Sequence, residues 1–287
     1  MTSELKYTLA AALFVFLLVA TYGVRVAVKG RARFDRIDRQ GGSQLLSKGV
    51  MEVGYWILFP LAKVLVRLRV SPNRVSWSSF GFGFLAGACL AFGHFGFGAI
   101  CATVSGLLDS VDGMVARLSS VASDAGEVVD AAIDRYVEFF FLSGLVIYYR
   151  EVVGLQVLAL LALLGSFMVS YSTTKAEALK IEPPKGLMRR PERAVYLTAG
   201  AALSAVSTSW FETAREFSSP LGYPMVLALG MVAVLANVSS IERLWSIAKA
   251  LRLREKQQTD GGTRTAKQIP VETPGGRFGH HPADVGR

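Results

Sequence analysis

The sequence predicts an all-α, polytopic membrane protein: a six-helix transmembrane bundle with an interfacial amphipathic helix and an extra N-terminal transmembrane helix. Hydrophobic residues make up 52% of the 287 residues and charged residues only 18%, whereas about a quarter of a soluble domain is charged. The mean hydropathy is +0.39. The apolar residues also gather in segments of roughly 20, the length that crosses a bilayer as a helix.

Seven apolar segments are long enough, or nearly long enough, to span a membrane. The first resembles a signal peptide, but its apolar stretch is too long, and Lys29, Arg31 and Arg33 follow it instead of preceding it. We therefore expect residues 1–43 to form a transmembrane anchor and a basic linker. The seven expected spans are 7–28, 74–93, 96–117, 127–149, 152–174, 193–211 and 221–241.

Residues 44–70 differ in their pattern from the expected spans, because charged residues interrupt the apolar positions. Tyr55 and Trp56 suit the headgroup level, so this segment is expected to lie in the membrane interface. It opens a membrane domain that we place at 44–250. Residues 251–287 are rich in Gly, Thr, Gln and Pro and are expected to form a disordered cytoplasmic tail.

Basic residues predict the orientation of the chain. They follow the first span, the fifth span and the last span, and they are nearly absent from the alternate loops. Because basic loops stay in the cytoplasm, the N-terminus is expected outside and the C-terminus inside a cell membrane. The formal net charge of +9 is thus explained mostly by basic residues in loops that are expected to stay in the cytoplasm. No nucleic-acid partner is expected, since the basic runs lack interleaved aromatic residues.

Two other sequence features narrow the possibilities. Cys89 and Cys101 lie in apolar runs, and His94, His280 and His281 are the only histidines, so a zinc site or a disulfide framework is not indicated. The six glycines between residues 81 and 98 follow no strand, which argues against a nucleotide-binding loop. Small residues along a span instead predict close helix packing.

Four aspartates and an arginine lie at the expected cytoplasmic ends of two neighbouring spans. Asp109, Asp112 and Arg117 share one arc of the first helix, and Asp130 and Asp134 are one turn apart on the second. A tight turn at 118–125 would make the two helices antiparallel neighbours. The four carboxylates are therefore expected to converge in one cleft.

Such a cluster requires compensating cations, because charge inside a bilayer is costly and one arginine cannot neutralise four carboxylates. A site with only oxygen ligands favours Mg²⁺, Mn²⁺ or Ca²⁺. Two such ions near a diphosphate suit phosphoryl transfer. Two alternatives remain from the residues alone: an ion-pair network that ties helices together, and the proton or cation pathway of a transporter.

The pattern D-x-x-D-G-x-x-A-R, eight residues, then G-x-x-x-D-x-x-x-D resembles the signature of the CDP-alcohol phosphotransferases. The resemblance covers about residues 44–250. It implies a membrane enzyme of phospholipid synthesis, often homodimeric, that transfers the phosphatidyl group of CDP-diacylglycerol to an alcohol and releases CMP. It also implies two divalent metal ions, Mg²⁺ or Mn²⁺. The matching positions are Asp109, Asp112, Gly113, Ala116, Arg117, Gly126, Asp130 and Asp134.

By this resemblance, the four aspartates hold the metals, and Asp134 also removes the proton of the acceptor. The segment S-P-N-R-V-S at 71–76 resembles a family element that holds the cytidine, although it also suits ordinary capping of a helix. Residues expected to bind the CDP-lipid are Pro72, Asn73, Val75, Ser76, Gly113, Ala116, Arg117, Ser123 and Gly126.

Segments 170–177 and 186–193 resemble the phosphatidylinositol phosphate synthase branch of the family, whose acceptor is inositol 1-phosphate. Lys175, Arg190 and Arg193 are then expected to bind the acceptor, unless they only mark the cytoplasmic ends of spans. Arg189 departs from that branch, which often has Glu there. Glycerol 3-phosphate is the alternative acceptor, and an uncharged alcohol such as serine or inositol comes third.

Overall fold

The computed structural model describes residues 3–30, 48–182, 186, 188–211 and 221–266. All regular structure within these ranges is α-helical, which confirms the predicted fold class. The helices are α1 (Ser3–Lys29), α3 (Lys48–Arg67), α4 (Pro72–Ala91), α5 (Phe95–Leu118), α6 (Asp124–Tyr148), α7 (Val153–Ala178), α8 (Arg190–Phe211) and α9 (Tyr223–Ala266).

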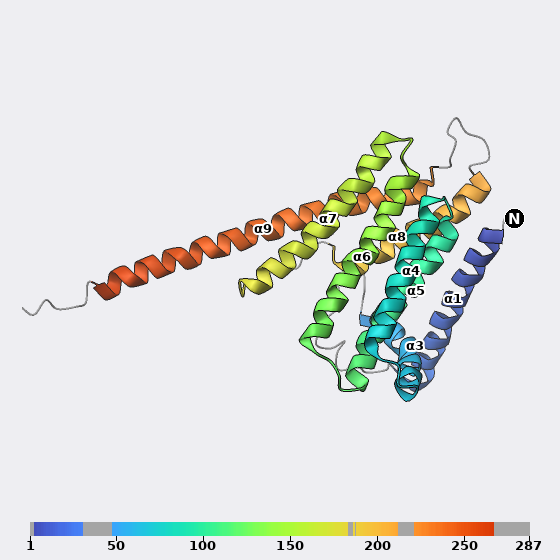
Figure 1. Cartoon of the computed structure of the whole chain (residues 1–287), viewed down its shortest axis with the longest axis horizontal. Helices are drawn as coiled ribbons and strands as arrows, with labels where there is room; N and C mark the ends of the chain where they lie inside the picture. Colours follow the sequence, from blue (N-terminus) through green and yellow to red (C-terminus); the bar gives the residue numbers. More distant parts are fainter. Residues whose placement is uncertain (1–2, 31–47, 183–185, 187, 212–220, 267–287) are drawn as a thin grey trace, which may run out of the picture.

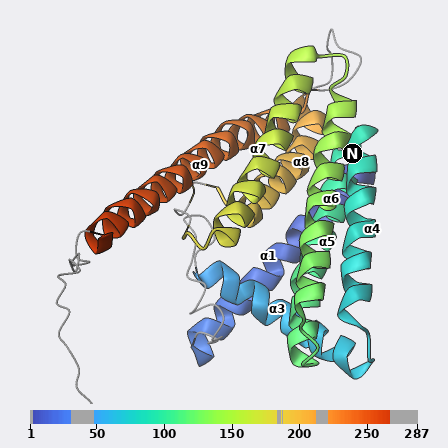
Figure 2. The same cartoon turned by 60° about the vertical axis from the view of Figure 1, so that its left-hand side comes forward.

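Helices α4 to α9 pack side by side in a closed order (Figures 1 and 2). Around this ring, α5 contacts α4, α4 contacts α6, and α6 contacts α7. Helix α7 then contacts α9, α9 contacts α8, and α8 contacts α5. The consecutive helices α5 and α6 make few direct contacts with each other, and α4 packs against both. This arrangement leaves the centre of the bundle to be filled by side chains of several helices.

Among the described residues, four helices are long and apolar enough to cross a membrane, as expected of a multi-pass membrane protein. They contain the segments Glu4–Val28, Phe95–Leu118, Val153–Ala178 and Tyr223–Lys256. Helices α4, α6 and α8 lie where the other spans were expected but do not meet the same test of length and composition. In α6, carboxylates interrupt the apolar sequence, including Asp130, Asp134 and Glu138.

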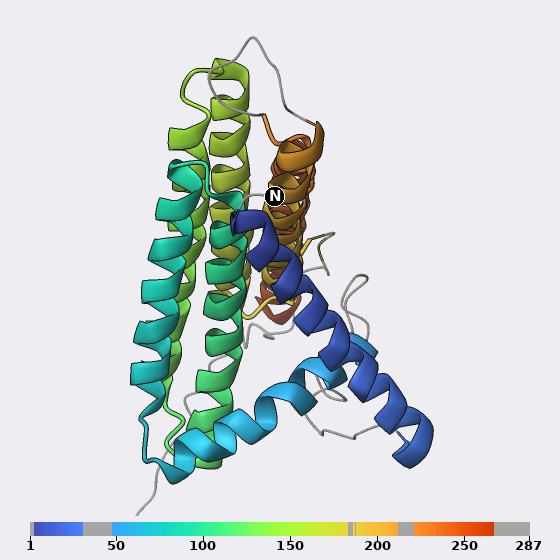
Figure 3. The ribbon, with the colours of Figure 1, turned by 90° about the vertical axis from the view of Figure 1, so that its right-hand side faces the viewer.

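Helix α3 lies across one end of the bundle, at an angle to α4 and α5 (Figure 3). Its buried Leu58 and Ala62 pack against Val75 of α4 and Val111 and Val115 of α5. A helix is thus present within the segment 44–70, of which residues 44–47 lie outside the described part of the chain.

The N-terminal helix α1 is attached to the bundle at both of its ends. Near its start, Oε1 of Glu4 accepts a hydrogen bond from the backbone N–H of Gly96, the second residue of α5 (2.6 Å). Near its end, the ring of Tyr22 packs on Trp56 of α3 with centroids 5.4 Å apart. The extra helix therefore contacts both the helix and the interfacial segment that frame the acidic motif.

Helix α9 is much longer than the span predicted at 221–241. It runs to Ala266 and projects beyond the rest of the bundle (Figure 1). The disorder expected from residue 251 is therefore wrong for 251–266, and residues 267–287 lie outside the described part. The physical reason is local, since residues 241–258 contain mostly good helix formers and neither Gly nor Pro.

The glycines of α4 allow α6 to approach closely, as their spacing predicted. A Cβ added at Gly87 would overlap the backbone carbonyl of Phe140, and one added at Gly144 would overlap the carbonyl of Gly87. In contrast, nothing lies within 4 Å of the corresponding position at Gly81. The close backbone contact thus lies in the C-terminal halves of the two helices.

Replacing Gly87 with Ala is expected to destabilise the protein by about 1–3 kcal/mol, because the backbones of α4 and α6 would have to separate. Unfolding of purified protein in detergent would measure the change. Gly81→Ala on the same helix is the matched control and should be neutral or slightly stabilising. Equal losses of stability in the two variants would contradict the close approach.

Candidate active site

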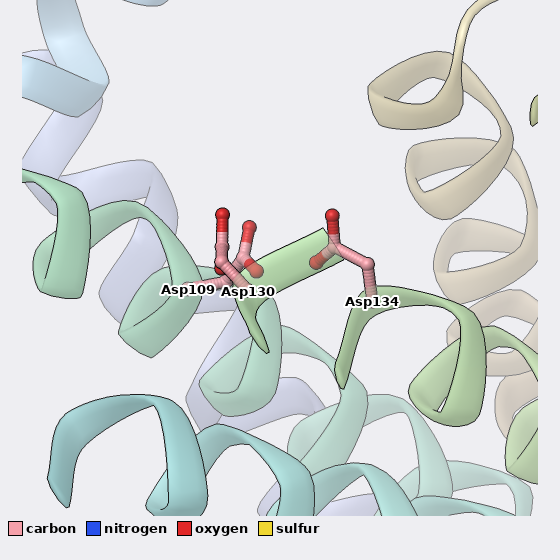
Figure 4. A group of neighbouring side chains, drawn as sticks. All are labelled: Asp109, Asp130 and Asp134. Atoms are coloured by element: carbon pink, nitrogen blue, oxygen red, sulfur yellow. The ribbon is translucent and has the colours of Figure 1, made fainter. Parts of the chain in front are cut away.

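Three aspartates of the acidic motif meet at one place between α5 and α6. Asp109, Asp130 and Asp134 each offer a carboxylate oxygen, and these oxygens all lie within 4.8 Å of one another. Figure 4 shows the three carboxylates pointing to the same side of their helices. The turn between α5 and α6 and the one-turn spacing on α6 bring them together, as the sequence predicted.

Asp112 lies apart from this group, so three carboxylates converge and not the expected four. Its Oδ2 accepts a hydrogen bond of 2.6 Å from the hydroxyl of Ser76 on α4, and its side chain is buried. Three residues along a helix change the direction of a side chain by about 60°. That rotation turns Asp112 from the cluster toward α4, although it stays near enough to Asp109 and Asp130 to interact with their charges.

The carboxylate cluster suits hard divalent cations. Its donors are all oxygens, which Mg²⁺ and Mn²⁺ prefer. Oδ1 of Asp130 is buried and has no hydrogen-bond partner among the described residues, and an orphaned buried acceptor of this kind needs a cation or a water. The donor set therefore fits the metal ions that the motif implies.

A cavity of about 80 Å³ opens beside the cluster, inside the bundle. Helices α4, α5, α6 and α8 all contribute to its wall. One side carries the carboxylates of Asp109 and Asp134, and another carries small or apolar residues such as Gly83, Ala86 and Leu197. Such a chamber can hold a polar reacting group beside the metal ligands while apolar surface surrounds it.

The three residues expected to bind the acceptor occupy different environments. Arg190, the first residue of α8, places its guanidinium on the carboxylates: it forms an ion pair with Asp134, and its Nη1 is 3.6 Å from Oδ2 of Asp109. Arg193 is fully buried. Lys175 is exposed near the end of α7. Only Arg190 therefore reaches the cluster.

Arg193 forms a buried ion pair deeper in the bundle. Its Nε and Nη2 donate to the two carboxylate oxygens of Glu138 at 2.8 and 3.1 Å, and Nη2 also reaches the carbonyl of Ser166 at 3.5 Å. Its Nη1 has no hydrogen-bond partner among the described residues. In this position Arg193 links α8, α6 and α7.

Residues expected to meet the nucleotide surround the same end of the bundle, where α4 and α6 begin and α5 ends. Arg117 is exposed, donates to the hydroxyl of Tyr55 at 3.4 Å, and folds over Gly113, where an added Cβ would lie 3.2 Å from its Nη1. Ser123 caps α6 by accepting from the N–H of Gly126 at 3.2 Å.

The remaining residues of this expected set belong to α4 and α5. Pro72 is the first residue of α4 and Asn73 beside it is exposed, whereas Val75 is buried against α5. Ser76 donates its hydrogen bond to Asp112, as described above, and Ala116 is half-buried two residues before the end of α5. Without a bound nucleotide, these contacts are within the protein.

Sequence reasoning missed two residues of the site. Glu138 follows Asp134 by four residues and lines the cavity, and the one-turn stripe through Asp130, Asp134 and Glu138 was visible in the sequence. The sequence indicated for Arg243 of α9 only a positive charge that helps to predict the orientation of the chain. It is buried, its Nη1 donates to Oγ1 of Thr173 at 2.6 Å, and its Nε has no hydrogen-bond partner among the described residues.

Several of the known proteins that this chain resembles are synthases of inositol phosphate lipids. Phosphatidylinositol phosphate synthase of Corynebacterium glutamicum is 25% identical over 213 residues, which cover 72% of this chain and 91% of the relative. The synthase of Mycobacteroides abscessus is 28% identical over 195 residues, 66% of this chain and 82% of the relative. Archaetidylinositol phosphate synthase of Methanothermobacter thermautotrophicus is 31% identical over 158 residues, covering 55% and 80%.

Solved structures show the same fold. Crystal structures of the phosphatidylinositol phosphate synthase of Mycobacterium tuberculosis superpose with a TM-score of 0.58 at 23% identity, both with CDP-DAG bound and in complex with manganese and citrate. The first covers 67% of this chain and 93% of the known one, and the second covers 66% and 88%.

The family model for CDP-alcohol phosphatidyltransferase matches residues 69–238, more than half of the chain. This match includes the whole acidic motif, the carboxylate cluster and the cavity wall. It begins after α1 and α3, which end at Lys29 and Arg67. The chain therefore belongs to the CDP-alcohol phosphatidyltransferase family.

Proposed function

We propose that this protein transfers the phosphatidyl group of CDP-diacylglycerol to inositol 1-phosphate and releases CMP. The observation that supports this proposal most strongly is the cluster of carboxylates from Asp109, Asp130 and Asp134 beside a cavity within a helical membrane bundle. Membership of the family supports the reaction, and relatives that are phosphatidylinositol phosphate synthases support the acceptor.

We infer that Asp109, Asp130 and Asp134, together with the neighbouring Asp112, hold two divalent ions, Mg²⁺ or Mn²⁺. When bound, such ions supply positive charge that stabilises a diphosphate and its leaving group. The hydrogen bond from Ser76 holds Asp112 in place beside the cluster. The protein's own contribution is thus a fixed set of oxygens at the wall of a cavity.

In this proposal, Asp134 is the general base. Its carboxylate lines the cavity, and it accepts the proton of the acceptor hydroxyl as that oxygen attacks the phosphorus attached to diacylglycerol. The new O–P bond forms as the bond between that phosphorus and the CMP oxygen breaks. Arg117, exposed near the end of α5, would bind the departing phosphate, because its guanidinium provides a planar pair of donors.

The nucleotide is proposed to lie where α4 and α6 begin and α5 ends. Gly113 leaves room there for a ligand near the backbone of α5, and the exposed Asn73 and Ser123 offer polar groups at the same end. Binding would replace the contacts that Arg117 and Ser123 now make within the protein. The lipid chains would remain in the bilayer.

A group of buried arginines supports a phosphorylated acceptor. Arg243 is buried and forms no ion pair with a described carboxylate, and Arg189 and Arg193 are close enough to interact with its charge. Its Nε lies 2.7 Å from the position that an added Cβ at Gly186 would occupy. Several buried cations with one carboxylate partner, Glu138, suit an anionic group of the acceptor.

Arg243→Gln is expected to raise the KM for inositol 1-phosphate by about 10- to 100-fold, the cost of losing a hydrogen bond to a charged group. The KM for CDP-diacylglycerol should change less than twofold. Lys175→Ala should shift the two KM values in the same unequal way. Lys249→Ala on the exposed face of α9 is the control. Equal changes in both KM values would contradict an acceptor site at these residues.

Orientation and assembly belong to the same proposal. The cluster, α3 and the basic end of α7 share one end of the bundle, so the positive-inside rule places the site at the cytoplasmic face of the cell membrane, with the N-terminus outside. The family resemblance supports a homodimer. Crosslinking in membranes would test the assembly, and labelling of single cysteines at Lys6 and Lys256 would test the orientation.

An acceptor panel tests the proposed function. Purified protein would receive CDP-diacylglycerol and Mg²⁺ or Mn²⁺ with inositol 1-phosphate, glycerol 3-phosphate, inositol or serine, and both CMP and the lipid product would be measured. We expect metal-dependent CMP release with inositol 1-phosphate. Turnover only with glycerol 3-phosphate would show that glycerol 3-phosphate, and not inositol 1-phosphate, is the acceptor. Ion flux in liposomes without CMP release would contradict the proposal that the protein is an enzyme.

A further inference from the structure

Arg190 occupies the place that the proposed function gives to metal ions. Its guanidinium extends from the first turn of α8 across the cavity to the carboxylates of Asp134 and Asp109. Both aspartates belong to the cluster whose oxygens lie within 4.8 Å of one another. The arginine therefore supplies positive charge to the same oxygens that would bind a divalent ion.

A second ion pair fixes the helix that carries Arg190. Arg193, three residues later on the same face of α8, binds Glu138, which follows Asp134 by one turn on α6. The Arg193 side chain is fully buried, whereas about a third of the Arg190 side chain is exposed. The two pairs thus form a buried, fixed link and a second link that is open to the cavity.

We propose that Arg190 is a built-in counter-cation, which holds the cluster in the metal-free protein and is displaced from it when divalent ions bind. This inference rests on the proposed metal site. A guanidinium brings one positive charge to the oxygens, whereas each ion brings two and binds at much shorter distances. Like charges repel strongly at such separations, so the guanidinium and the ions cannot share the same carboxylate oxygens.

After its displacement from the carboxylates, the guanidinium of Arg190 could bind another anionic group. Its backbone is fixed in the first turn of α8, so its guanidinium can only turn to nearby parts of the cavity. There it is available to an anionic group. By reciprocity of linked equilibria, metal binding would then favour binding of the phosphorylated acceptor, and the acceptor would favour retention of the metal.

The affinity for Mn²⁺ tests the displacement without any measurement of turnover. Titration of the purified full chain, followed by calorimetry or the Mn²⁺ spin signal, would compare the wild type with Arg190→Gln and Arg190→Lys. We expect Arg190→Gln to bind Mn²⁺ about tenfold more tightly, because the competing cation is gone, and Arg190→Lys to be intermediate. Arg189→Gln removes the same charge outside the cluster and should change the affinity less than twofold.

Thermal unfolding separates competition from a general effect of charge. Without metal, Arg190→Gln should lower the Tm because the carboxylates lose their cation. With saturating Mn²⁺, its Tm should equal that of the wild type. Equal losses with and without Mn²⁺, or an unchanged Mn²⁺ affinity, would overturn the displacement alone. If no variant bound Mn²⁺, the proposed metal site would fail as well.

Discussion

Replacing Asp134 with Asn is expected to reduce CMP release by about 10²–10⁴-fold, the usual contribution of a general base. The substitution keeps the size of the side chain but removes its ability to accept a proton. Asp134 lies about three turns into α6, with its carboxylate at the wall of the cavity. The acceptor hydroxyl would then lack the group that makes it nucleophilic.

The assay for Asp134→Asn needs two readouts. Binding of CDP-diacylglycerol, measured with a labelled lipid in detergent or nanodiscs, should remain measurable. Asp124→Asn, at the exposed first residue of the same helix, is the matched control and should keep its turnover. Normal turnover of Asp134→Asn at saturating substrates would contradict the assignment of the base, whatever happens to binding.

Replacing Glu138 with Ala is expected to destabilise the fold by about 3–5 kcal/mol, because it leaves the charge of Arg193 buried without its partner. Arg193 is fully buried, and both of its bonds to a carboxylate go to Glu138. Unfolding in detergent would measure the loss. Glu242→Ala, at an exposed position of α9, should have little effect.

A double variant sharpens this test. Glu138→Leu combined with Arg193→Met removes both charges and keeps apolar volume, so it should recover most of the stability lost by the single variants. If the double variant were as unstable as the sum of the two single ones, the two residues would not act as a pair. A small effect of Glu138→Ala alone would contradict the importance of the pair.

The helices and the meeting of three aspartates could be predicted from the sequence, because both depend on local rules. Apolar length places the spans, and the one-turn spacing of Asp130 and Asp134 puts them on one face of a helix. The turn after α5 then brings Asp109 to them. These features need no knowledge of how distant helices pack.

Contacts between distant helices could not be predicted in the same way. Asp112 has the same chemistry as Asp109, yet it bonds to Ser76, 36 residues away, because of where α4 packs. Arg190 and Arg193 both looked like positive charges at the end of a span. Packing of α8 against the interior puts one on the cluster and the other in a buried pair with Glu138.

The most direct test of the account is to locate bound Mn²⁺ by anomalous scattering in crystals of the protein soaked with or grown in the metal. The account predicts anomalous density between Asp109, Asp130 and Asp134, within coordination distance of their carboxylate oxygens, and its loss in crystals of Asp130→Asn. Anomalous density only at other residues, with the three carboxylates ordered and empty, would contradict it.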